Sequence, residues 1–139
     1  MGIKIVKSRQ TYQVKTITDY PEYDGSKPET AYTKDLSILK IRRAFVFDDN
    51  YSPICLPSTR DDAYENKKGI VLGWGLFKRE EFPDRLMIVN VSTESNSECE
   101  NANWFNINPK IHICAGRATK YDACSGDSGG PLVIKENNK

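Results

Sequence analysis

The sequence of 139 residues has little of what several classes of protein require. It contains one histidine, and its 20 basic and 19 acidic side chains leave a net charge of +1. This balance gives no reason to expect nucleic acid or an anionic membrane as a partner. No apolar run approaches the ~18 residues of a membrane span, and residues 1–10 lack the apolar core of a signal peptide. We therefore expect a globular chain with neither nucleic acid nor a membrane as its partner.

The four cysteines are informative through the pattern that they do not form. They include no Cys-x-x-Cys pair, and a single histidine cannot complete a metal site with them. We therefore expect neither a metal nor another cofactor. Disulfides are the favoured interpretation, and they indicate a secreted protein in an oxidising compartment. The alternative is a cytosolic protein with four reduced, buried cysteines.

Short strand-like segments recur along the chain and are separated by Gly, Pro or Asn. They cover residues 3–20, 35–41, 69–75, 85–91, 111–116 and the apolar run that begins at Leu132. A short helix is predicted over 97–103, with Ser95 or Ser97 as its N-cap. Period-2 segments interrupted about every 8 to 12 residues indicate an all-β sandwich or barrel.

One serine lies in a glycine-rich stretch just before this last apolar run. The stretch reads Gly126-Asp127-Ser128-Gly129-Gly130-Pro131. A tight turn there can present the Ser128 hydroxyl as a nucleophile while backbone N–H groups point at one spot. Glycine leaves room for a substrate and permits unusual backbone angles. The alternative is a plain hairpin connection, although the glycines are not spaced as a two-residue turn requires.

The Gly-Asp-Ser-Gly-Gly-Pro run closely resembles the active-site serine segment of the trypsin/chymotrypsin-like serine proteases. The segments Ile54-Cys55-Leu56-Pro57 and Gly73-Trp74-Gly75 are also similar to that family, and the resemblance extends from about 12 to 133. It implies an all-β fold of two six-stranded antiparallel β-barrels, incomplete in this chain. Residues 1–60 would form the second half of the first barrel, 61–68 the link, and 69–139 most of the second barrel. Two-barrel enzymes commonly need about 200–250 residues, so we expect a fragment of the family domain.

The same resemblance implies roles for five residues. Ser128 would attack the scissile carbonyl, and Asp35, at the head of the 35–41 strand, would hold a catalytic histidine. A solvent-facing aspartate at a strand end is the alternative for Asp35. The N–H groups of Gly126 and Ser128 would form the oxyanion hole. Asp122 would lie at the base of the specificity pocket and pair with Lys or Arg of a protein or peptide substrate. Asp127 would bind the new amino terminus of an activated zymogen.

The resemblance also implies what the cysteines do. Cys99 and Cys114 would form the disulfide beside the specificity pocket. Cys124 matches a cysteine whose family partner lies beyond the end of this chain, and Cys55 matches one that bonds an upstream propeptide or regulatory domain in many members. A further family disulfide would need cysteines near Gly69 and Ile134, and both are absent.

The family's catalytic histidine has no counterpart before Asp35, where an Ala-His-Cys context would be expected. His112, the single histidine, matches a non-catalytic strand position near the specificity pocket. The order Asp35, His112, Ser128 is that of the subtilisin triad, but the glycines around Ser128 do not follow the subtilisin pattern. We therefore expect a chain that lacks its catalytic base and is inactive by itself.

Two functions from different classes stay open. The first is a trypsin-like serine endopeptidase, made as a secreted zymogen and cutting after Lys or Arg. The second is a secreted, non-catalytic protease homologue that acts as a binding or adaptor module. Intact Ser128, Asp35 and Asp122 favour the enzyme. A third interpretation is that Met1 is a misplaced start in a broken gene. Sequons at Asn50 and Asn90 are candidate glycosylation sites, the first weakened by Pro53.

Overall fold

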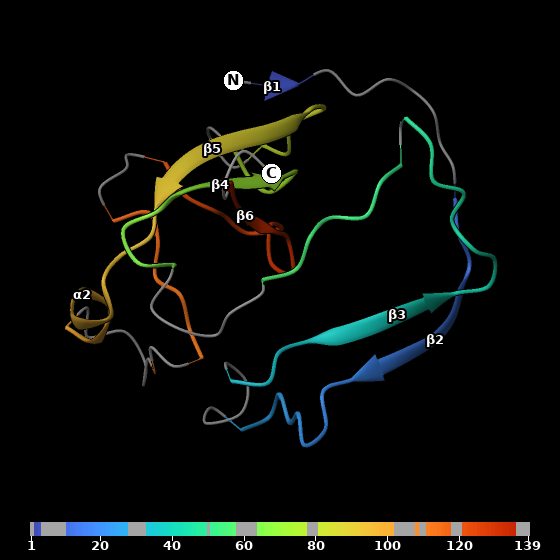
Figure 1. The fold of residues 1–139 in the computed structure, drawn as a ribbon, viewed down its shortest axis with the longest axis horizontal. Coiled ribbons are helices and arrows are strands. Elements are labelled where there is room, and N and C mark those ends of the chain that lie inside the picture. Colours follow the sequence, from blue (N-terminus) through green and yellow to red (C-terminus); the bar gives the residue numbers. More distant parts are fainter. Residues whose placement is uncertain are drawn as a thin grey trace. The chain divides into compact units, whose positions relative to one another are not determined.

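The computed structural model describes residues 2–3, 11–27, 33–49, 51–57, 64–77, 81–101, 108, 111–117 and 121–135. The chain divides into two compact units, one of Ser8–Arg60 and one of Met1–Lys7 with Asp61–Lys139. We call them the smaller and the larger unit. Each contains its own antiparallel sheet, and the regular elements of the described residues are mostly strands, with the short helix α2 (Asn96–Glu100) in the larger unit (Figure 1).

The larger unit is built on a four-stranded sheet in the order β1-β5-β4-β6. Its strands are β1 (Gly2–Ile3), β4 (Lys68–Gly73), β5 (Leu86–Ser92) and β6 (Leu132–Ile134). Gly69 pairs with Val91 on β5 and with Ile134 on β6. A Cβ on Gly69 would lie 2.9 Å from Leu132 Cδ1 and 3.6 Å from Ile134 Cγ1, so larger neighbours fill the space above it. The positions that would carry a further family disulfide are therefore a packed glycine–isoleucine pair.

A buried threonine joins the end of β5 to two other segments. Thr93 is 2% exposed. Its Oγ1 accepts a hydrogen bond from Lys67 N–H at 2.8 Å and donates to the Tyr64 carbonyl oxygen. Thr93 also forms an isolated bridge with Ala115. The buried hydroxyl therefore has partners, as a buried polar group requires.

The strand predicted over 111–116 is wrong. The described backbone of this segment meets the end of β5 at the single-residue Ala115 bridge, which is flanked by hydrogen bonds from Glu94 N–H to Cys114 O and from Gly116 N–H to Ser92 O. Its first residue instead closes a turn, in which Ile111 N–H donates to Asn108 O at 3.0 Å. Too few residues lie beside β5 to build a ladder, although the side chains alternate as in a strand.

Helix α2 begins one residue earlier than the sequence predicts. Ser95 is its N-cap, and its hydroxyl accepts a hydrogen bond from Glu98 N–H while the Glu98 carboxylate accepts one from Ser95 N–H. This reciprocal pair is a capping box, which satisfies backbone donors that a helix start leaves open. Residues 102–103 of the predicted helix lie outside the described residues.

The smaller unit contains a two-stranded ribbon of β2 (Val14–Asp19) and β3 (Ser37–Ile41). A β-bulge between Val14 and Thr16 shifts the register, so that Val14 lies opposite Ile41 while Ile17 lies opposite Leu39. Residues three apart would otherwise point to opposite faces, and the bulge gathers these four apolar side chains on one face. Ile17 and Leu39 are nevertheless 63% and 58% exposed.

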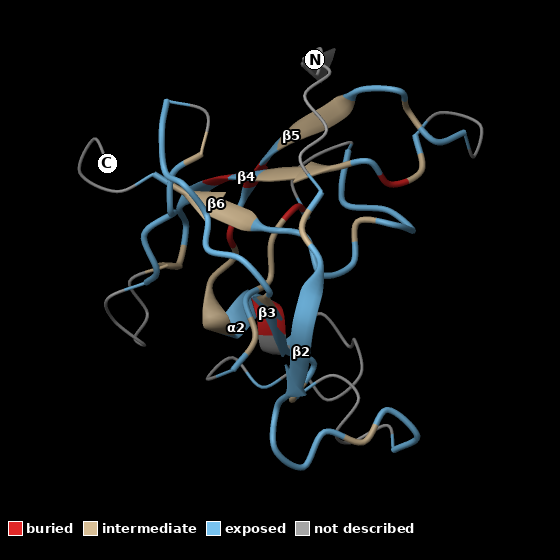
Figure 2. Cartoon of the chain, turned by 90° about the vertical axis from the view of Figure 1, so that its right-hand side faces the viewer, coloured by how far each residue is buried: buried red, intermediate tan, exposed pale blue. Residues whose placement is uncertain are grey.

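The two sheets differ plainly in burial. Figure 2 shows β4, β5 and β6 mostly at intermediate exposure, while β2 is exposed. The run 3–20, predicted as two strands, is divided between them, because β1 pairs with β5 of the larger unit and β2 belongs to the ribbon. Residues 4–10 lie outside the described residues. In the part of the chain that the structure describes, no helix is long and apolar enough to cross a bilayer.

Candidate active site

Two consecutive tight turns present Ser128 at the surface. Asp127 N–H donates to Cys124 O at 2.9 Å, and Gly130 N–H donates to Asp127 O at 2.8 Å. Gly126 and Gly129 have φ angles of +96° and +80°, a region that residues with a Cβ rarely adopt. Ser128 is exposed, and no described residue forms a hydrogen bond with its hydroxyl.

The carboxylate of Asp127 fastens this turn to the end of β4. Its Oδ1 accepts a hydrogen bond from Gly75 N–H at 2.6 Å, and its Oδ2 accepts one from Cys124 N–H at 3.0 Å. Leu76 N–H adds a bond to Ser125 O at 2.8 Å. Charge-assisted bonds to backbone N–H are among the stronger ones in proteins. The serine turn and the segment after β4, 52 residues apart in sequence, therefore form one assembly.

Glycines make the space that this carboxylate occupies. A Cβ on Gly73 would lie 1.8 Å from Asp127 Oδ1, and one on Gly75 would lie 2.4 Å from Asp127 Cγ. No side chain fits at such distances without displacing the carboxylate. The sequence analysis singled out both glycines and Asp127 separately, but it did not predict their contact. The available signal for that contact was the pair of glycines on either side of Trp74, because a turn alone does not require two glycines.

Asp122 lies against the segment that follows the disulfide. A Cβ on Gly116 would lie 3.1 Å from Asp122 Oδ1, and Gly116 itself has φ +98° and donates its N–H to Ser92 O at 3.0 Å. Asp122 Oδ1 also accepts a hydrogen bond from Ala123 N–H at 2.7 Å. The residue is exposed, so its carboxylate can meet a cation from solution.

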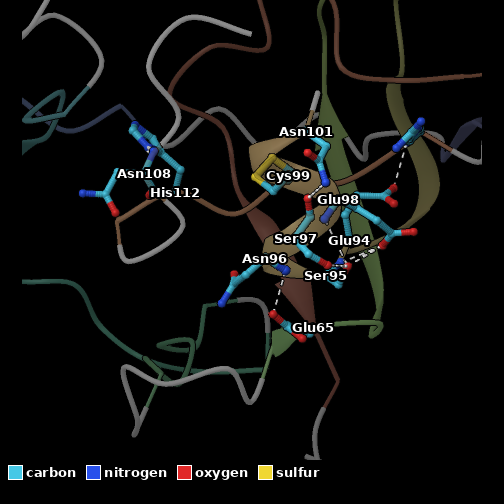
Figure 3. Close-up of a disulfide and its surroundings, with 12 residues drawn as sticks. Glu65, Glu94, Ser95, Asn96, Ser97, Glu98, Cys99, Asn101, Asn108 and His112 are labelled. Carbon is cyan, nitrogen blue, oxygen red and sulfur yellow. Dashed lines mark hydrogen bonds between the residues drawn. A yellow bond between two sulfur atoms is a disulfide. The ribbon is translucent and has the colours of Figure 1, made fainter. Parts of the chain in front are cut away.

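Cys99 and Cys114 are joined by a disulfide with a Cα–Cα distance of 5.6 Å, closing a loop with a sequence separation of 15 (Figure 3). Cys99 belongs to α2 and is 3% exposed. Two carboxylates hold backbone N–H groups around this bridge: Glu65 accepts from Asn96 N–H at 2.7 Å, and Glu94 accepts from Arg117 N–H at 3.1 Å. Helix α2 and the segment carrying Gly116 are thus tied together.

His112 takes part in a local turn (Figure 3). Its N–H donates to Asn108 O at 2.9 Å, and its Nδ1 lies 3.0 Å from Asn108 N, positioned to accept that N–H. The same Nδ1 lies 3.1 Å from Asn108 O, so both backbone polar groups of Asn108 face the imidazole. No described residue forms a hydrogen bond with the Ser128 hydroxyl, so His112 is not placed as its base here.

Three of the predicted residues are still to be described, namely Asp35, Cys55 and Cys124. Asp35 belongs to the smaller unit, exposed and just before β3. Cys55 and Cys124 are exposed and free of disulfides. Among the described residues, no three His, Cys, Asp or Glu side chains gather as metal ligands would.

The chain is similar in sequence and structure to known proteins. The sequence model of the family described as Trypsin matches residues 1–138. Transmembrane protease serine 11G of Rattus norvegicus is 35% identical over 131 residues, which are 91% of this chain and 30% of that protein. Granzyme A of Bos taurus is 33% identical, over 91% of this chain and 50% of that protein. The solved structure of neuropsin, a serine protease expressed in the limbic system of mouse brain, has a TM-score of 0.78 at 31% identity, covering 90% of this chain and 55% of that one.

Antiparallel strands with a serine presented on a glycine turn define the class as that of the strand-rich serine proteases. More narrowly, the chain belongs to the trypsin family. The expected fold class is confirmed, since the mostly stranded structure matches a trypsin-like protease. The chain spans 30% to 50% of the length of the two curated relatives named above.

Proposed function

We propose that this chain is part of a serine endopeptidase that cleaves proteins or peptides after Lys or Arg. The observation that carries the proposal is the anchored serine turn, in which Asp127 bonds Gly75 N–H while Ser128 stays exposed. A nucleophile held on a rigid assembly reacts in a defined geometry, which is a large part of what a protease must supply. Membership of a family of serine proteases supports the same conclusion.

In this proposal Ser128 forms the acyl bond with the scissile carbonyl, and the leaving amine takes the proton that a histidine has removed from Oγ. Asp35 orients that histidine, which is not among these 139 residues, since their single histidine is His112. The N–H groups of Gly126 and Ser128 stabilise the oxyanion. Neither N–H donates to a described residue, so both are available, and one such donor is worth about 3–4 kcal/mol in the transition state.

Specificity is assigned to the Asp122 carboxylate. A Lys or Arg side chain of the substrate would neutralise it on binding, whereas an apolar side chain would leave a desolvated, unpaired charge. We further propose a zymogen in which Asp127 exchanges one backbone partner for a new amino terminus. The Cys99–Cys114 disulfide supports secretion, and a propeptide or regulatory domain would bond the exposed Cys55.

The second candidate is a non-catalytic homologue that acts as a binding or adaptor module. One observation favours it: no described residue forms a hydrogen bond with the Ser128 hydroxyl. A fold does not by itself imply a function, so the fold does not decide between the two. We keep the domain division as part of the proposal, with residues 1–60 in the first barrel, 61–68 as the link and 69–139 in the second, although β1 pairs with β5 of the larger unit.

The test supplies the missing base. The chain is co-refolded with a histidine-bearing segment from a relative such as granzyme A, and matched Arg, Lys and Phe ester and amide substrates are assayed. We expect cleavage after Arg and Lys only, and loss of activity in Ser128→Ala and Asp35→Ala. Asp122→Ser should lower kcat/KM for Arg by orders of magnitude, each 1.4 kcal/mol being about tenfold, but spare a small reactive ester. A refolded complex that binds substrates without cleaving them would favour the adaptor, and preference for Phe would refute the Asp122 assignment.

A further inference from the structure

The two sequons of this chain, at Asn50 and Asn90, have no role in the proposed catalytic site. Asn50 lies outside the described residues, and Pro53 follows its sequon. The sequon of Asn90, Val91 and Ser92 lies within β5, so the structure shows what each of its residues does. An acceptor for an N-linked glycan needs an Asn side chain that reaches solvent and that the fold does not use.

The residues of this sequon alternate between the two faces of β5. Val91 is 3% exposed, whereas Asn90 and Ser92 are both exposed. Successive side chains of a strand point to opposite faces, so Asn90 and Ser92 share the solvent face while Val91 enters the packed one. The amide and the hydroxyl of the sequon are therefore presented together, on one side of the strand.

Neither polar side chain of the sequon takes part in the hydrogen bonding of the described fold. Asn90 and Ser92 form no side-chain hydrogen bond with a described residue, although the backbone oxygen of Ser92 accepts one from Gly116 N–H. The next residue, Thr93, is 2% exposed, and its hydroxyl joins two other segments. The fold thus accounts for the Thr93 hydroxyl but not for the Asn90 amide or the Ser92 hydroxyl.

Asn90 and the Asp127 carboxylate lie on opposite faces of the sheet. Asn90 is paired with Ile70 on β4, the strand beside β5 in Figure 1. Gly73 lies three residues further along β4 and therefore faces the other way, and a Cβ on it would point at Asp127 Oδ1. A group attached to Asn90 would extend from the face of Ile70 and leave the contact of Asp127 with β4 undisturbed.

Apolar surface that a glycan could cover lies beside Asn90. Ile70, directly across on β4, is 38% exposed, and its partner on β6 is Val133. Residues opposite each other on paired strands have Cβ atoms about 4.5–5.5 Å apart, so the first sugar on Asn90 would lie beside Ile70. A glycan is bulky and solubilising, and this position gives it apolar surface to shield.

We propose that Asn90 carries an N-linked glycan on the solvent face of β5. The amide nitrogen of Asn90 forms a bond to the anomeric carbon of the first sugar, while the bond from that carbon to the pyrophosphate of a lipid-linked oligosaccharide donor breaks. The pyrophosphate leaves with the bonding electron pair, and the amide loses one proton. The inference rests on the proposed secretion, because this donor is met in the secretory pathway.

The test supplies a cleavable secretion leader, so that its result does not depend on how the natural protein is exported. The 139-residue chain is produced in cultured mammalian cells, and its mass is measured before and after treatment with a peptide N-glycosidase. Treatment in heavy-oxygen water labels the former glycan site, and peptide mapping should place the label at Asn90. Asn90→Gln and Ser92→Ala should each lose the glycan, whereas Ser92→Thr and the control Asn50→Gln should keep it.

A second measurement tests the position on the sheet. The glycosylated chain should unfold in urea at a midpoint no lower than that of the enzyme-treated chain, since the packed face stays intact. In chains without glycan, Thr93→Ala should lower the midpoint, because it removes a buried and bonded hydroxyl, and Asn90→Gln should not.

Three results would overturn the proposal: a leader-processed chain without a glycan, a label at Asn50 alone, or a glycan that lowers the midpoint. The first would leave the proposed secretion standing, because leader removal and the Cys99–Cys114 disulfide would still be observed. Failure of the secretion proposal would be seen separately, as absence of the natural protein from the medium of cells that express it without the added leader.

Discussion

The two sheets of this chain have similar sequences and different surroundings. β3, in the smaller unit, is richer in Ile and Leu than β4, in the larger one. β4 is paired on both sides, by β5 and β6, whereas the described ribbon has one pairing, between β2 and β3. Val91 on β5 is 3% exposed and Ile17 on β2 is 63% exposed. The alternation of apolar residues therefore predicts that a strand forms, but the segments packed beside the strand determine how far its side chains are buried.

This difference matters for the candidate site. The serine turn is attached to the sheet with two-sided pairing, through the contact of Asp127 with the end of β4. Asp35, in contrast, precedes β3 of the exposed ribbon. A two-stranded ribbon is at best marginally stable alone. A sheet of three or more strands with a packed apolar face can be stable by itself. The nucleophile is thus placed on the firmer of the two units.

The largest effect should come from detaching the serine turn from β4. Gly73→Ala places a Cβ where Asp127 Oδ1 now lies, so the carboxylate must leave both N–H partners. We expect a loss of roughly 3–5 kcal/mol in the larger unit, from two charge-assisted bonds and local repacking. Urea unfolding followed by tryptophan fluorescence measures it, while the ribbon amides in a heteronuclear NMR spectrum should stay unchanged.

A double-mutant cycle checks the cause. If the clash is with the Asp127 side chain, Gly73→Ala should cost little in an Asp127→Ala background, giving strong non-additivity. Gly25→Ala serves as a matched control in the smaller unit, since its Cβ would meet only the mobile end of Tyr23, at 2.9 Å. Additive losses for Gly73→Ala and Asp127→Ala would show that the contact is not what holds the turn.

The second effect concerns the disulfide of the larger unit. Cys99→Ala/Cys114→Ala opens a loop with a sequence separation of 15, which should cost about 3 kcal/mol in the chain-entropy model. Thermal unfolding with and without reductant measures it, and reductant should no longer affect the double variant. Cys55→Ser, at an exposed free cysteine, should leave stability within about 0.5 kcal/mol. A loss of equal size for Cys55→Ser would contradict this difference between the units.

Much of the local structure was predictable from the sequence, because it depends on near neighbours. The strands around 35–41, 69–75 and 85–91, and the capped helix after Ser95, follow from alternation and capping chemistry. The strand predicted over 111–116 was wrong because an alternating segment forms a ladder only where a partner segment runs beside it, and the local sequence does not show that partner. The contact of Asp127 with Gly73 and Gly75 joins positions about 50 residues apart, and no local pattern encodes it. The bulge that gathers Val14 with Ile17 was likewise visible only in the register.

A third effect measures the difference in burial between the sheets. Val91→Ala removes methyl groups from a side chain that is 3% exposed and should cost about 2 kcal/mol, because a cavity is left behind. Ile17→Ala removes more carbon, but from a side chain that is 63% exposed, and should cost less than about 0.5 kcal/mol. Denaturant midpoints of the two variants give the comparison. Equal losses would show that the ribbon face is covered in solution.

The smallest effect compares one carboxylate in each unit. The hydrogen bond from the Ser95 hydroxyl, with one from its backbone, holds the pKa of Glu98 below its ordinary value of 4.5. In the smaller unit, hydrogen bonds from the Ser26 hydroxyl and from Lys27 lower the pKa of Asp24 below 3.8. Both groups stabilise their folded segments above the ordinary pKa, and the contribution is lost as the pH falls through the lowered one. NMR titration of the Ser95 and Ser26 amides should give midpoints below 4.5 and 3.8, and Glu98→Gln should abolish the first.

Since Asp24 also pairs with Lys27 at 3.0 Å, about 0.5 M NaCl should raise its midpoint more than that of Glu98. Equal shifts with salt would mean that charge, and not the capping hydroxyl, governs both sites.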